Sequence, residues 1–153
     1  MTEPDRDTFW MRKALAEAEA AAMVEEVPVG CVIVHEGRIV GRGHNSVESL
    51  QDPTAHAEML ALSAAATTLG SWRLLDCELY VNLEPCTMCI GAMHLARIKR
   101  LVFGALDPKF GACGSIIDVP AEPRWNHSLE VRGGVLEDES AEMMRSFFKR
   151  LRH

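Results

Sequence analysis

The alternation of apolar and polar residues along the first half of the chain predicts a helix, a hairpin and a second helix. Residues 8–24, TFWMRKALAEAEAAAMV, are rich in Ala, Leu and Glu and predict a helix that Thr8 caps. The stretches GCVIV and RIVGRG flank the residues HEG, which is typical of a β-hairpin. A second helix is predicted to open near Asp52–Thr54 and to end at Gly70.

The second half of the chain continues to alternate strands and helices. Its predicted elements are a strand at 77–83, a helix at 86–98, a strand at 99–105, a glycine-rich loop at 106–115, a possible strand at 128–135 and a helix at 137–153. Strands separated by helices of this length indicate crossover connections. We therefore expect an α/β fold with three layers, α/β/α, and a mixed central sheet, in a single domain that spans residues 1–153.

Composition and charge narrow the class of protein. Apolar residues make up 48% of the chain and charged residues 25%, which is ordinary for a globular protein. The start, MTEPDRDTFW, lacks the features of a signal peptide, and no apolar stretch reaches the ~18 residues of a membrane span. We expect a cytoplasmic protein without a membrane segment. The net charge of −6 argues against nonspecific coating of nucleic acid but allows a local basic patch.

Two of the five cysteines form a Cys-x-x-Cys pair. The odd number argues against a disulfide framework, and Cys31, Cys77 and Cys113 are most simply small buried residues. Cys86 and Cys89 follow a proline at a predicted helix start, where residues three apart share one face. Taken alone, such a pair fits a redox couple, half of a structural zinc site or part of a catalytic zinc site.

His56 and Glu58 favour the catalytic zinc site. The chain has no second Cys-x-x-Cys, so His56 at the start of a predicted helix is the best further ligand. Three protein ligands and one open position are typical of catalytic zinc, and Glu58 could exchange protons with a water at that position. His-x-Glu followed after about 30 residues by Pro-Cys-x-x-Cys is the signature of zinc deaminases.

The motifs also resemble a known family. HAE at 56–58 and PCTMC at 85–89 resemble the cytidine/deoxycytidylate deaminase superfamily. The longer stretches VPVGCVIV, GRGHN, AHAEMLAL, LYVNLEPCTMCIGAMHLARIKRLVFGALDPKFGACGS and FFKR resemble bacterial tRNA-specific adenosine deaminases, from about residue 8 to the end.

This resemblance implies a fold, a reaction and a set of ligands. It implies a cytidine deaminase-like fold, a homodimer and one Zn²⁺ per subunit, held by His56, Cys86 and Cys89. The implied reaction is the hydrolytic deamination of adenosine to inosine at the wobble position of a tRNA anticodon, usually of an arginine tRNA. A zinc-bound hydroxide would attack, with Glu58 as the proton shuttle.

The resemblance assigns further residues to the substrate. Asn45 matches a residue that holds the target nucleoside. Val29 and the neighbouring stretch EVPVG match the pocket wall beside the flipped base, and the backbone after Glu84 matches a segment that orients the substrate. Asp107 lies in a loop that the resemblance places beside the substrate. The residues alone indicate a loop or cap role for Asn45, a core role for Val29 and a turn role for Asp107. Cys113 stands where relatives often carry an alanine, and we expect it not to be a ligand.

The C-terminal helix combines aromatic and basic side chains that suit single-stranded RNA. These are Phe147, Phe148, Lys149, Arg150, Arg152 and His153. RNA loops are bound by stacking of bases and by pairing of phosphates with Lys and Arg. Neighbouring helix residues point about 100° apart, so we expect one phenylalanine to be buried and the other to face the ligand. We expect Arg97, Lys99 and Arg100 to add to the basic surface.

Two other functions remain open from the sequence. A deaminase of a free nucleobase or nucleoside, of guanine or cytosine type, would have a similar catalytic core but would not need the aromatic and basic helix. A zinc-stabilised binding module without activity would not need Glu58 or an incomplete ligand set. The leading hypothesis is therefore a deaminase that acts on the anticodon stem-loop of a tRNA.

Overall fold

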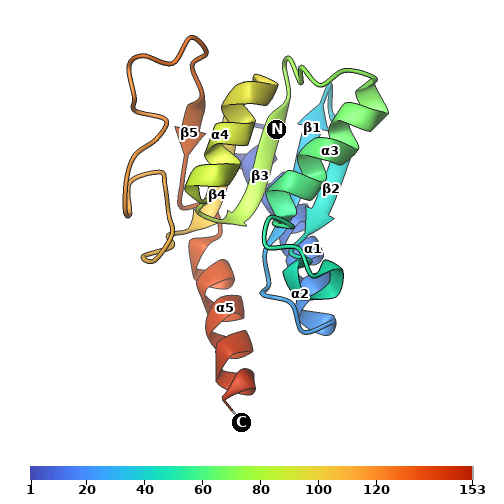
Figure 1. The fold of residues 1–153 in the computed structure, drawn as a ribbon, viewed down its shortest axis with the longest axis vertical. Helices are drawn as coiled ribbons and strands as arrows, with labels where there is room; N and C mark the ends of the chain where they lie inside the picture. Colours follow the sequence, from blue (N-terminus) through green and yellow to red (C-terminus); the bar gives the residue numbers. More distant parts are fainter. Residues whose placement is uncertain (153) are drawn as a thin grey trace.

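A five-stranded mixed sheet forms the centre of the molecule in the computed structural model, which describes residues 1–152 (Figure 1). The strands are β1 (Gly30–His35), β2 (Arg38–His44), β3 (Glu78–Leu83), β4 (Arg100–Ala105) and β5 (Glu130–Arg132). Their order in the sheet is β2-β1-β3-β4-β5. Strand β1 is antiparallel to both of its neighbours, whereas β3, β4 and β5 run parallel. His153, which was predicted to belong to the basic tail, lies outside the described residues.

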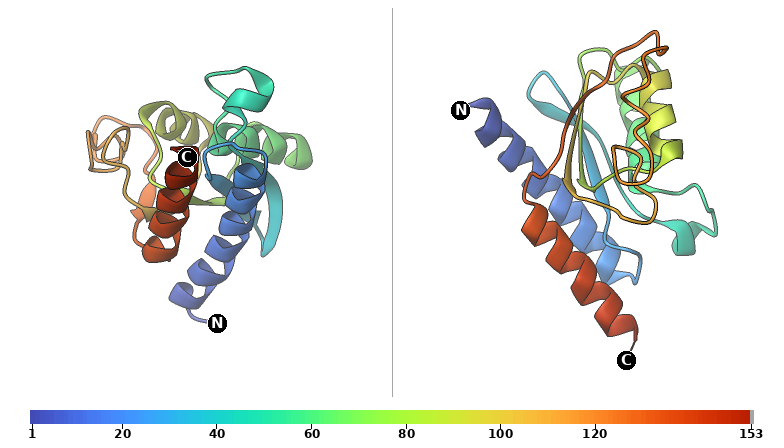
Figure 2. Two further views of the ribbon diagram at one scale, coloured as in Figure 1. Left: turned by 90° about the horizontal axis from the view of Figure 1, so that it is seen from below. Right: turned by 90° about the vertical axis from the view of Figure 1, so that its left-hand side faces the viewer.

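Helices cover both faces of this sheet (Figure 2). They are α1 (Glu3–Met23), α2 (Val47–Leu50), α3 (Ala57–Leu69), α4 (Thr87–Ala96) and α5 (Glu137–Leu151). Helices α1 and α5 pack on one face, and α3 and α4 pack on the other. This arrangement confirms the predicted three-layer α/β/α fold with a mixed sheet. Within residues 1–152, no helix is long and apolar enough to cross a membrane.

The strand residues divide between two hydrophobic cores because successive side chains point to opposite faces of a sheet. Ile33, Leu79 and Leu101 belong to the core beneath α3 and α4. Val32 and Tyr80, which alternate with them, belong to the core beneath α1. Both faces of the central strands are therefore buried, which explains why these strands read as nearly continuous apolar runs.

Two helices begin at residues other than those predicted. Helix α1 starts at Glu3 rather than Thr8, because Thr2 and Asp5 form a capping box in which the Asp5 N–H donates to Thr2 Oγ1 at 3.3 Å. Helix α3 starts at Ala57 rather than near Asp52. Asp52 instead stabilises a turn, since its Oδ1 accepts from the N–H of Thr54 at 2.8 Å. The single turn of α2 was not predicted.

Arg100 is buried at the start of β4 by a cluster of acidic side chains. It contacts Asp7 at 2.6 Å, Glu3 at 3.0 Å and Glu78 at 3.1 Å, and so joins α1 to the sheet. The prediction that Arg100 adds to a surface for RNA is therefore wrong. Lys99 precedes it at the amino end of β4, which is the edge of the sheet opposite to the carboxyl ends of β3 and β4.

The two ends of the chain lie at opposite ends of the molecule (Figures 1 and 2). Helix α1 starts near the edge of the sheet where β3 and β4 begin. Helix α5 extends past the edge where these two strands end. The aromatic and basic residues of α5 are therefore carried on the side of the carboxyl ends, where α/β proteins build their sites.

We predict that Gly30→Ala will destabilise the fold, because α1 passes directly over β1. A Cβ atom at position 30 would lie 2.2 Å from the carbonyl oxygen of Ala14 and 2.3 Å from the nitrogen of Ala18. The expected loss in the free energy of unfolding is about 3 kcal/mol, measured by urea denaturation. Gly91→Ala in α4 is the matched control: it meets nothing within 4 Å and should add roughly 0.5–1 kcal/mol. Equal stabilities of the two variants would contradict the close approach of α1.

Candidate active site

His56, Cys86 and Cys89 lie together at the starts of two neighbouring helices. His56 is the N-cap residue of α3, Cys86 is the N-cap residue of α4, and Cys89 lies in the first turn of α4. Both helices pack on the same face of the sheet and begin at the edge where β3 ends. Sequence reasoning placed all three residues at helix starts, and the structure brings them to one point.

The distances between these side chains fit a tetrahedral zinc ion. His56 Nδ1 lies 3.6 Å from the sulfur of Cys86 and 3.6 Å from that of Cys89. Zinc with bonds of about 2.3 Å to sulfur and about 2.05 Å to nitrogen separates these atoms by about 3.6 Å when the angle is tetrahedral. Within residues 1–152, no other group of three His, Cys, Asp or Glu side chains meets in this way. The donor set therefore fits zinc and leaves one of four positions open.

Cys86 is the more acidic of the two cysteines. A hydrogen bond from Cys89, together with His56, lowers the pKa of Cys86 to about 4. The same hydrogen bond raises the pKa of Cys89, which is the donor. At neutral pH Cys86 is therefore a thiolate, the form in which cysteine binds metals.

Glu58 lies in the first turn of α3, beside the three clustered side chains but not among them. Only 4% of its surface is exposed. Burial raises the pKa of Glu58 to about 7. A buried carboxyl group beside His56 and Cys89 can exchange protons with a molecule bound at the three clustered side chains.

Val29 and Asn45 lie next to the start of α3. The N–H of Asn45 donates to the carbonyl of Val29 at 3.0 Å, and the N–H of Ser46 donates to the carbonyl of Ala55 at 2.9 Å. Ala55 immediately precedes His56. Backbone hydrogen bonds thus connect these residues to His56, one of the three clustered side chains. The roles of Val29 and Asn45 in binding a nucleoside stay predictions.

Glu84 requires a correction, because its side chain is not available to a substrate. Its carboxylate is buried and accepts from the N–H groups of Asp107 at 3.0 Å, Cys113 at 2.9 Å and Ser115 at 3.2 Å, and from the Ser115 hydroxyl at 2.5 Å. Burial raises the pKa of Glu84, but these hydrogen bonds more than offset that and leave it below its usual value. Glu84 therefore shapes the loop 106–115. The role of the backbone after it stays a prediction.

The same loop contains Asp107 and Cys113. Asp107 Oδ1 accepts from the N–H groups of Lys109 at 3.0 Å and Phe110 at 3.2 Å, which is the turn role that its residue type predicted. Its contact with a substrate stays a prediction. Cys113 is half-buried rather than fully buried and lies outside the metal cluster, whereas Cys31 and Cys77 are buried.

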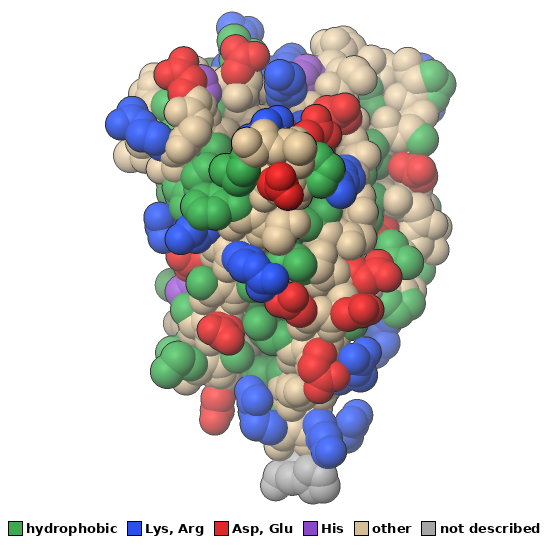
Figure 3. Space-filling model, turned by 180° about the vertical axis from the view of Figure 1, so that it is seen from behind, with side chains coloured by type: hydrophobic (Ala, Val, Ile, Leu, Met, Phe, Trp, Pro, Cys, Tyr) green, Lys and Arg blue, Asp and Glu red, His purple; other side chains and the backbone are tan. Residues whose placement is uncertain are grey.

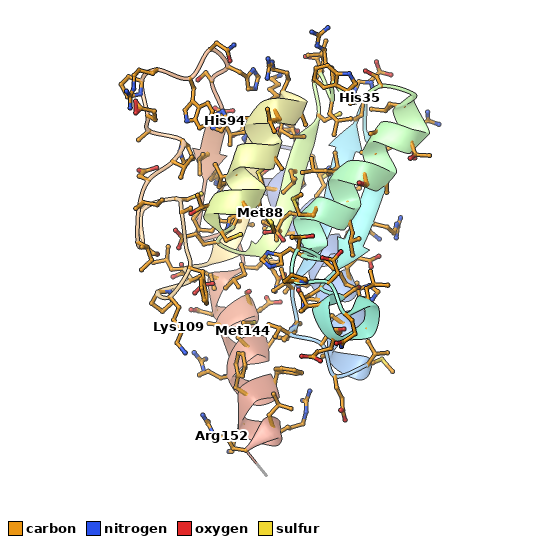
Figure 4. All side chains as sticks on the ribbon, viewed as in Figure 1. His35, Met88, His94, Lys109, Met144 and Arg152 are labelled. Atoms are coloured by element: carbon orange, nitrogen blue, oxygen red, sulfur yellow. The ribbon has the colours of Figure 1, made fainter. Side chains whose placement is uncertain are left out.

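The two phenylalanines of α5 are in edge-to-face contact but differ in exposure. Phe147 is 3% exposed and packs against the body, whereas Phe148 is 41% exposed. This confirms that one phenylalanine is buried and the other exposed, and it corrects the assignment of Phe147 to RNA binding. That Phe148 faces a ligand stays a prediction. Lys149, Arg150 and Arg152 are exposed, and Figure 3 shows Lys and Arg side chains around the end of α5. In Figure 4, Lys109 and Arg152 both lie beyond the carboxyl ends of the strands.

The resemblance assigns the stretch EVPVG to the pocket wall, but sequence reasoning gave no role to the side chain of Glu26, a buried carboxylate beside Asn45. Asn45 Nδ2 donates to Glu26 Oε1 at 3.2 Å. No periodicity or motif spacing reveals this contact, since the two residues belong to different segments that only the fold brings together. The one signal was an acidic residue next to the apolar stretch VPVG, and it did not indicate burial.

Comparison with known proteins identifies the family. A family model of the cytidine and deoxycytidylate deaminase zinc-binding region matches residues 4–105. The chain belongs to the cytidine and deoxycytidylate deaminase family. The matched region includes His56, Glu58, Cys86 and Cys89, so the three clustered side chains lie in the zinc-binding region of the family.

Individual relatives of this deaminase include enzymes of two kinds. It is 47% identical over 147 residues to the tRNA-specific adenosine deaminase of Bacillus subtilis, an alignment that covers 96% of this chain and 91% of the relative. A solved structure from work on A-to-I editing at the wobble position of transfer RNA is 46% identical, with a TM-score of 0.85, and covers 89% of this chain and 99% of its own. The guanine deaminase of Nitrosomonas europaea is 28% identical, with a TM-score of 0.76, and covers 90% and 81%.

We predict that Glu84→Gln will loosen the loop 106–115. The amide of Gln presents a donor where the carboxylate accepts, so at least one buried N–H group loses its partner. The expected cost in the free energy of unfolding is about 1–3 kcal/mol, measured by urea denaturation. Ser115→Ala removes only the hydroxyl and should cost less. A Glu84→Gln variant as stable as the parent would contradict the role of the carboxylate in holding the loop.

Proposed function

We propose that this deaminase converts adenosine to inosine at the wobble position of a tRNA anticodon, in an arginine tRNA. The observation that carries the proposal is the meeting of His56, Cys86 and Cys89 with the enclosed carboxyl group of Glu58. The identity of 46–48% to proteins named for tRNA adenosine deamination supports the choice of substrate.

The chemistry requires one metal and one proton carrier. His56, Cys86 and Cys89 would hold one Zn²⁺ per subunit, which would supply a Lewis acid for hydrolysis at C6 of adenine. Glu58 accepts a proton from the attacking water and delivers it to N1 of the ring. It then transfers the second proton to the exocyclic nitrogen, which leaves as ammonia while C6 keeps the oxygen. The overall reaction thus consumes adenosine and one water and yields inosine and ammonia.

The residues around the cluster are placed to hold the nucleoside. Asn45 offers its amide beside the start of α3, and Val29 offers an apolar wall next to it. Asp107 lies in the loop that Glu84 holds, and the N–H of Ala112 in this loop donates to the carbonyl of Pro85, the neighbour of Cys86. We propose that these three residues bind and orient the target nucleoside, which is already poorly stacked in an anticodon loop.

Helix α5 supplies the surface for the rest of the anticodon loop. Phe148 is exposed for stacking, and Lys149, Arg150 and Arg152 are exposed for phosphates. Arg150 also lies over the ring of Phe147 at 5.9 Å, so that Phe147 supports the surface from below. A local basic surface of this kind binds RNA even though the chain carries a net charge of −6.

We further propose that residues 1–153 form one deaminase domain that acts as a homodimer in the cytoplasm. The homodimer is an expectation from the family resemblance. Four exposed apolar side chains on the loop after β4 give a second subunit an apolar surface to cover: Leu106, Phe110, Ile116 and Ile117.

The alternative function is deamination of free guanine or cytosine. The 28% identity to a guanine deaminase with the same fold supports this alternative. Binding of a small base requires only the enclosed cluster, however. The exposed aromatic and basic residues of α5 would then have no role in binding the substrate. The experiment on function therefore compares the two kinds of substrate directly.

We predict that the purified protein will form inosine in an anticodon stem-loop with a wobble adenosine and will release little ammonia from free guanine, cytosine or adenosine. Inosine is measured by nucleoside chromatography. Glu58→Ala should lower the rate by roughly 10²–10⁴-fold while zinc, measured by mass spectrometry, stays bound. Glu19→Ala, an exposed change on α1, is the control. Turnover of guanine alone would favour the alternative, and loss of zinc in Glu58→Ala would mean that Glu58 is a ligand.

We predict that Phe148→Ala will weaken binding of the same stem-loop by about tenfold, because one stacked base loses its partner. Binding is measured by fluorescence anisotropy at a fixed salt concentration. Phe9→Ala, an exposed aromatic on α1, should leave binding unchanged. Phe147→Ala should instead cost about 3–5 kcal/mol of stability, since it empties a buried site. Unchanged binding by Phe148→Ala would remove α5 from the RNA surface.

A further inference from the structure

Glu26 is a buried carboxylate between Asn45 and the one-turn helix α2. It lies in the connection from α1 to β1 and is 1% exposed. Besides the Asn45 amide at 3.2 Å, it accepts from the N–H of Glu48 at 3.2 Å, the N–H of Ser49 at 2.6 Å and the hydroxyl of Ser49 at 2.7 Å. These four hydrogen bonds offset the cost of burying a charge.

The position of Asn45 links Glu26 to the metal cluster. The backbone of Asn45 is fixed on one side by the carbonyl of Val29, and the next residue is fixed by the carbonyl of Ala55. His56 follows Ala55 directly. The Asn45 side chain is thus close to the start of α3, and Glu26 is the group that its amide meets inside the protein.

A carboxylate determines which way a neighbouring amide turns. Ionised carboxylates only accept hydrogen bonds, so the Nδ2 atom of Asn45 must face Glu26. Among residues 1–152, this is the one hydrogen bond that the Asn45 side chain makes. The Oδ1 atom and the second Nδ2 hydrogen therefore hold fixed positions as an acceptor and a donor for a nucleoside.

We propose that Glu26 is a positioning residue for deamination. It fixes the orientation of the Asn45 amide and, through that amide, the orientation of the target nucleoside. This inference rests on the proposed function, because it takes Asn45 to contact the nucleoside. The hydrogen bonds of Glu26 go to Asn45, Glu48 and Ser49 and not to His56, Cys86 or Cys89.

The test begins with Glu26→Gln, which keeps the size of the side chain and removes its charge. The Gln amide offers both a donor and an acceptor, so the Asn45 amide is no longer forced into one orientation. We expect kcat/KM for the wobble-adenosine stem-loop to fall about tenfold, the effect of one misplaced hydrogen bond, with zinc content unchanged. Ser49→Ala is the matched control, because it removes a hydroxyl donor to the same carboxylate and leaves the Asn45 contact in place. It should leave kcat/KM unchanged.

A double-mutant cycle separates positioning from a structural role. If Glu26 acts through Asn45, then Glu26→Gln combined with Asn45→Ala should be no slower than Asn45→Ala alone. Additive losses would overturn the proposal. A loss in Ser49→Ala as large as that in Glu26→Gln would also overturn it, since Glu26 would then act by holding α2.

An NMR measurement keeps this test separate from the proposed function. The side-chain ¹⁵N–H₂ signal of Asn45, recorded without substrate, should shift in Glu26→Gln and stay in place in Ser49→Ala. An unshifted signal in Glu26→Gln would overturn the proposal whatever the substrate is. If the signal shifts but the parent protein forms no inosine in the stem-loop, the proposed function fails while the positioning of Asn45 is supported. The kinetic cycle is then run on whichever free base the protein deaminates.

Discussion

The active site depends on two helices that begin side by side at one edge of the sheet. His56 and Cys86 are the N-cap residues of α3 and α4, and both have extended backbone conformations. The separation of the ligands is therefore set by where these helices start and by how they pack on the sheet. Small residues let α3 approach β2 and β1 closely: Ala57, Ala61 and Ala65 are completely buried. Any change that moves either helix changes the distances between the three candidate zinc ligands.

Two buried carboxylates shape the surroundings of this site in the same way. Glu26 accepts hydrogen bonds from Asn45 and from α2, and Glu84 accepts hydrogen bonds from the loop 106–115. Burial alone would raise the pKa of each carboxyl group, but the hydrogen bonds that each accepts bring it below its usual value. Both groups are therefore charged at neutral pH. Charged acceptors make stronger hydrogen bonds than neutral ones, so irregular segments become fixed without helices or strands of their own.

The sequence predicted the features that depend on local pattern and missed those that depend on distant contacts. Apolar runs and motif spacing located the helices and strands around the site and the residues His56, Cys86 and Cys89. Burial of Phe147 rather than Phe148 depends on how α5 packs, and the sequence predicted only that the two would differ. Arg100 looked like a free basic residue because its partner Asp7 lies 93 positions away. The hydrogen bonds of Glu26 and Glu84 join separate segments in the same manner, and a single sequence contains no periodic signal for them.

The opposite positions of the two chain ends have a practical consequence for work with this protein. The start of α1 lies away from the edge of the sheet that carries the metal cluster, whereas the end of α5 extends past that edge (Figure 1). A fusion partner or affinity tag joined before residue 1 would lie at the far end of the molecule. The same tag joined after the last residue would adjoin the exposed basic side chains of α5 and obstruct the RNA surface that we propose for them. The amino terminus is therefore the side for attachment to a surface or to a second protein.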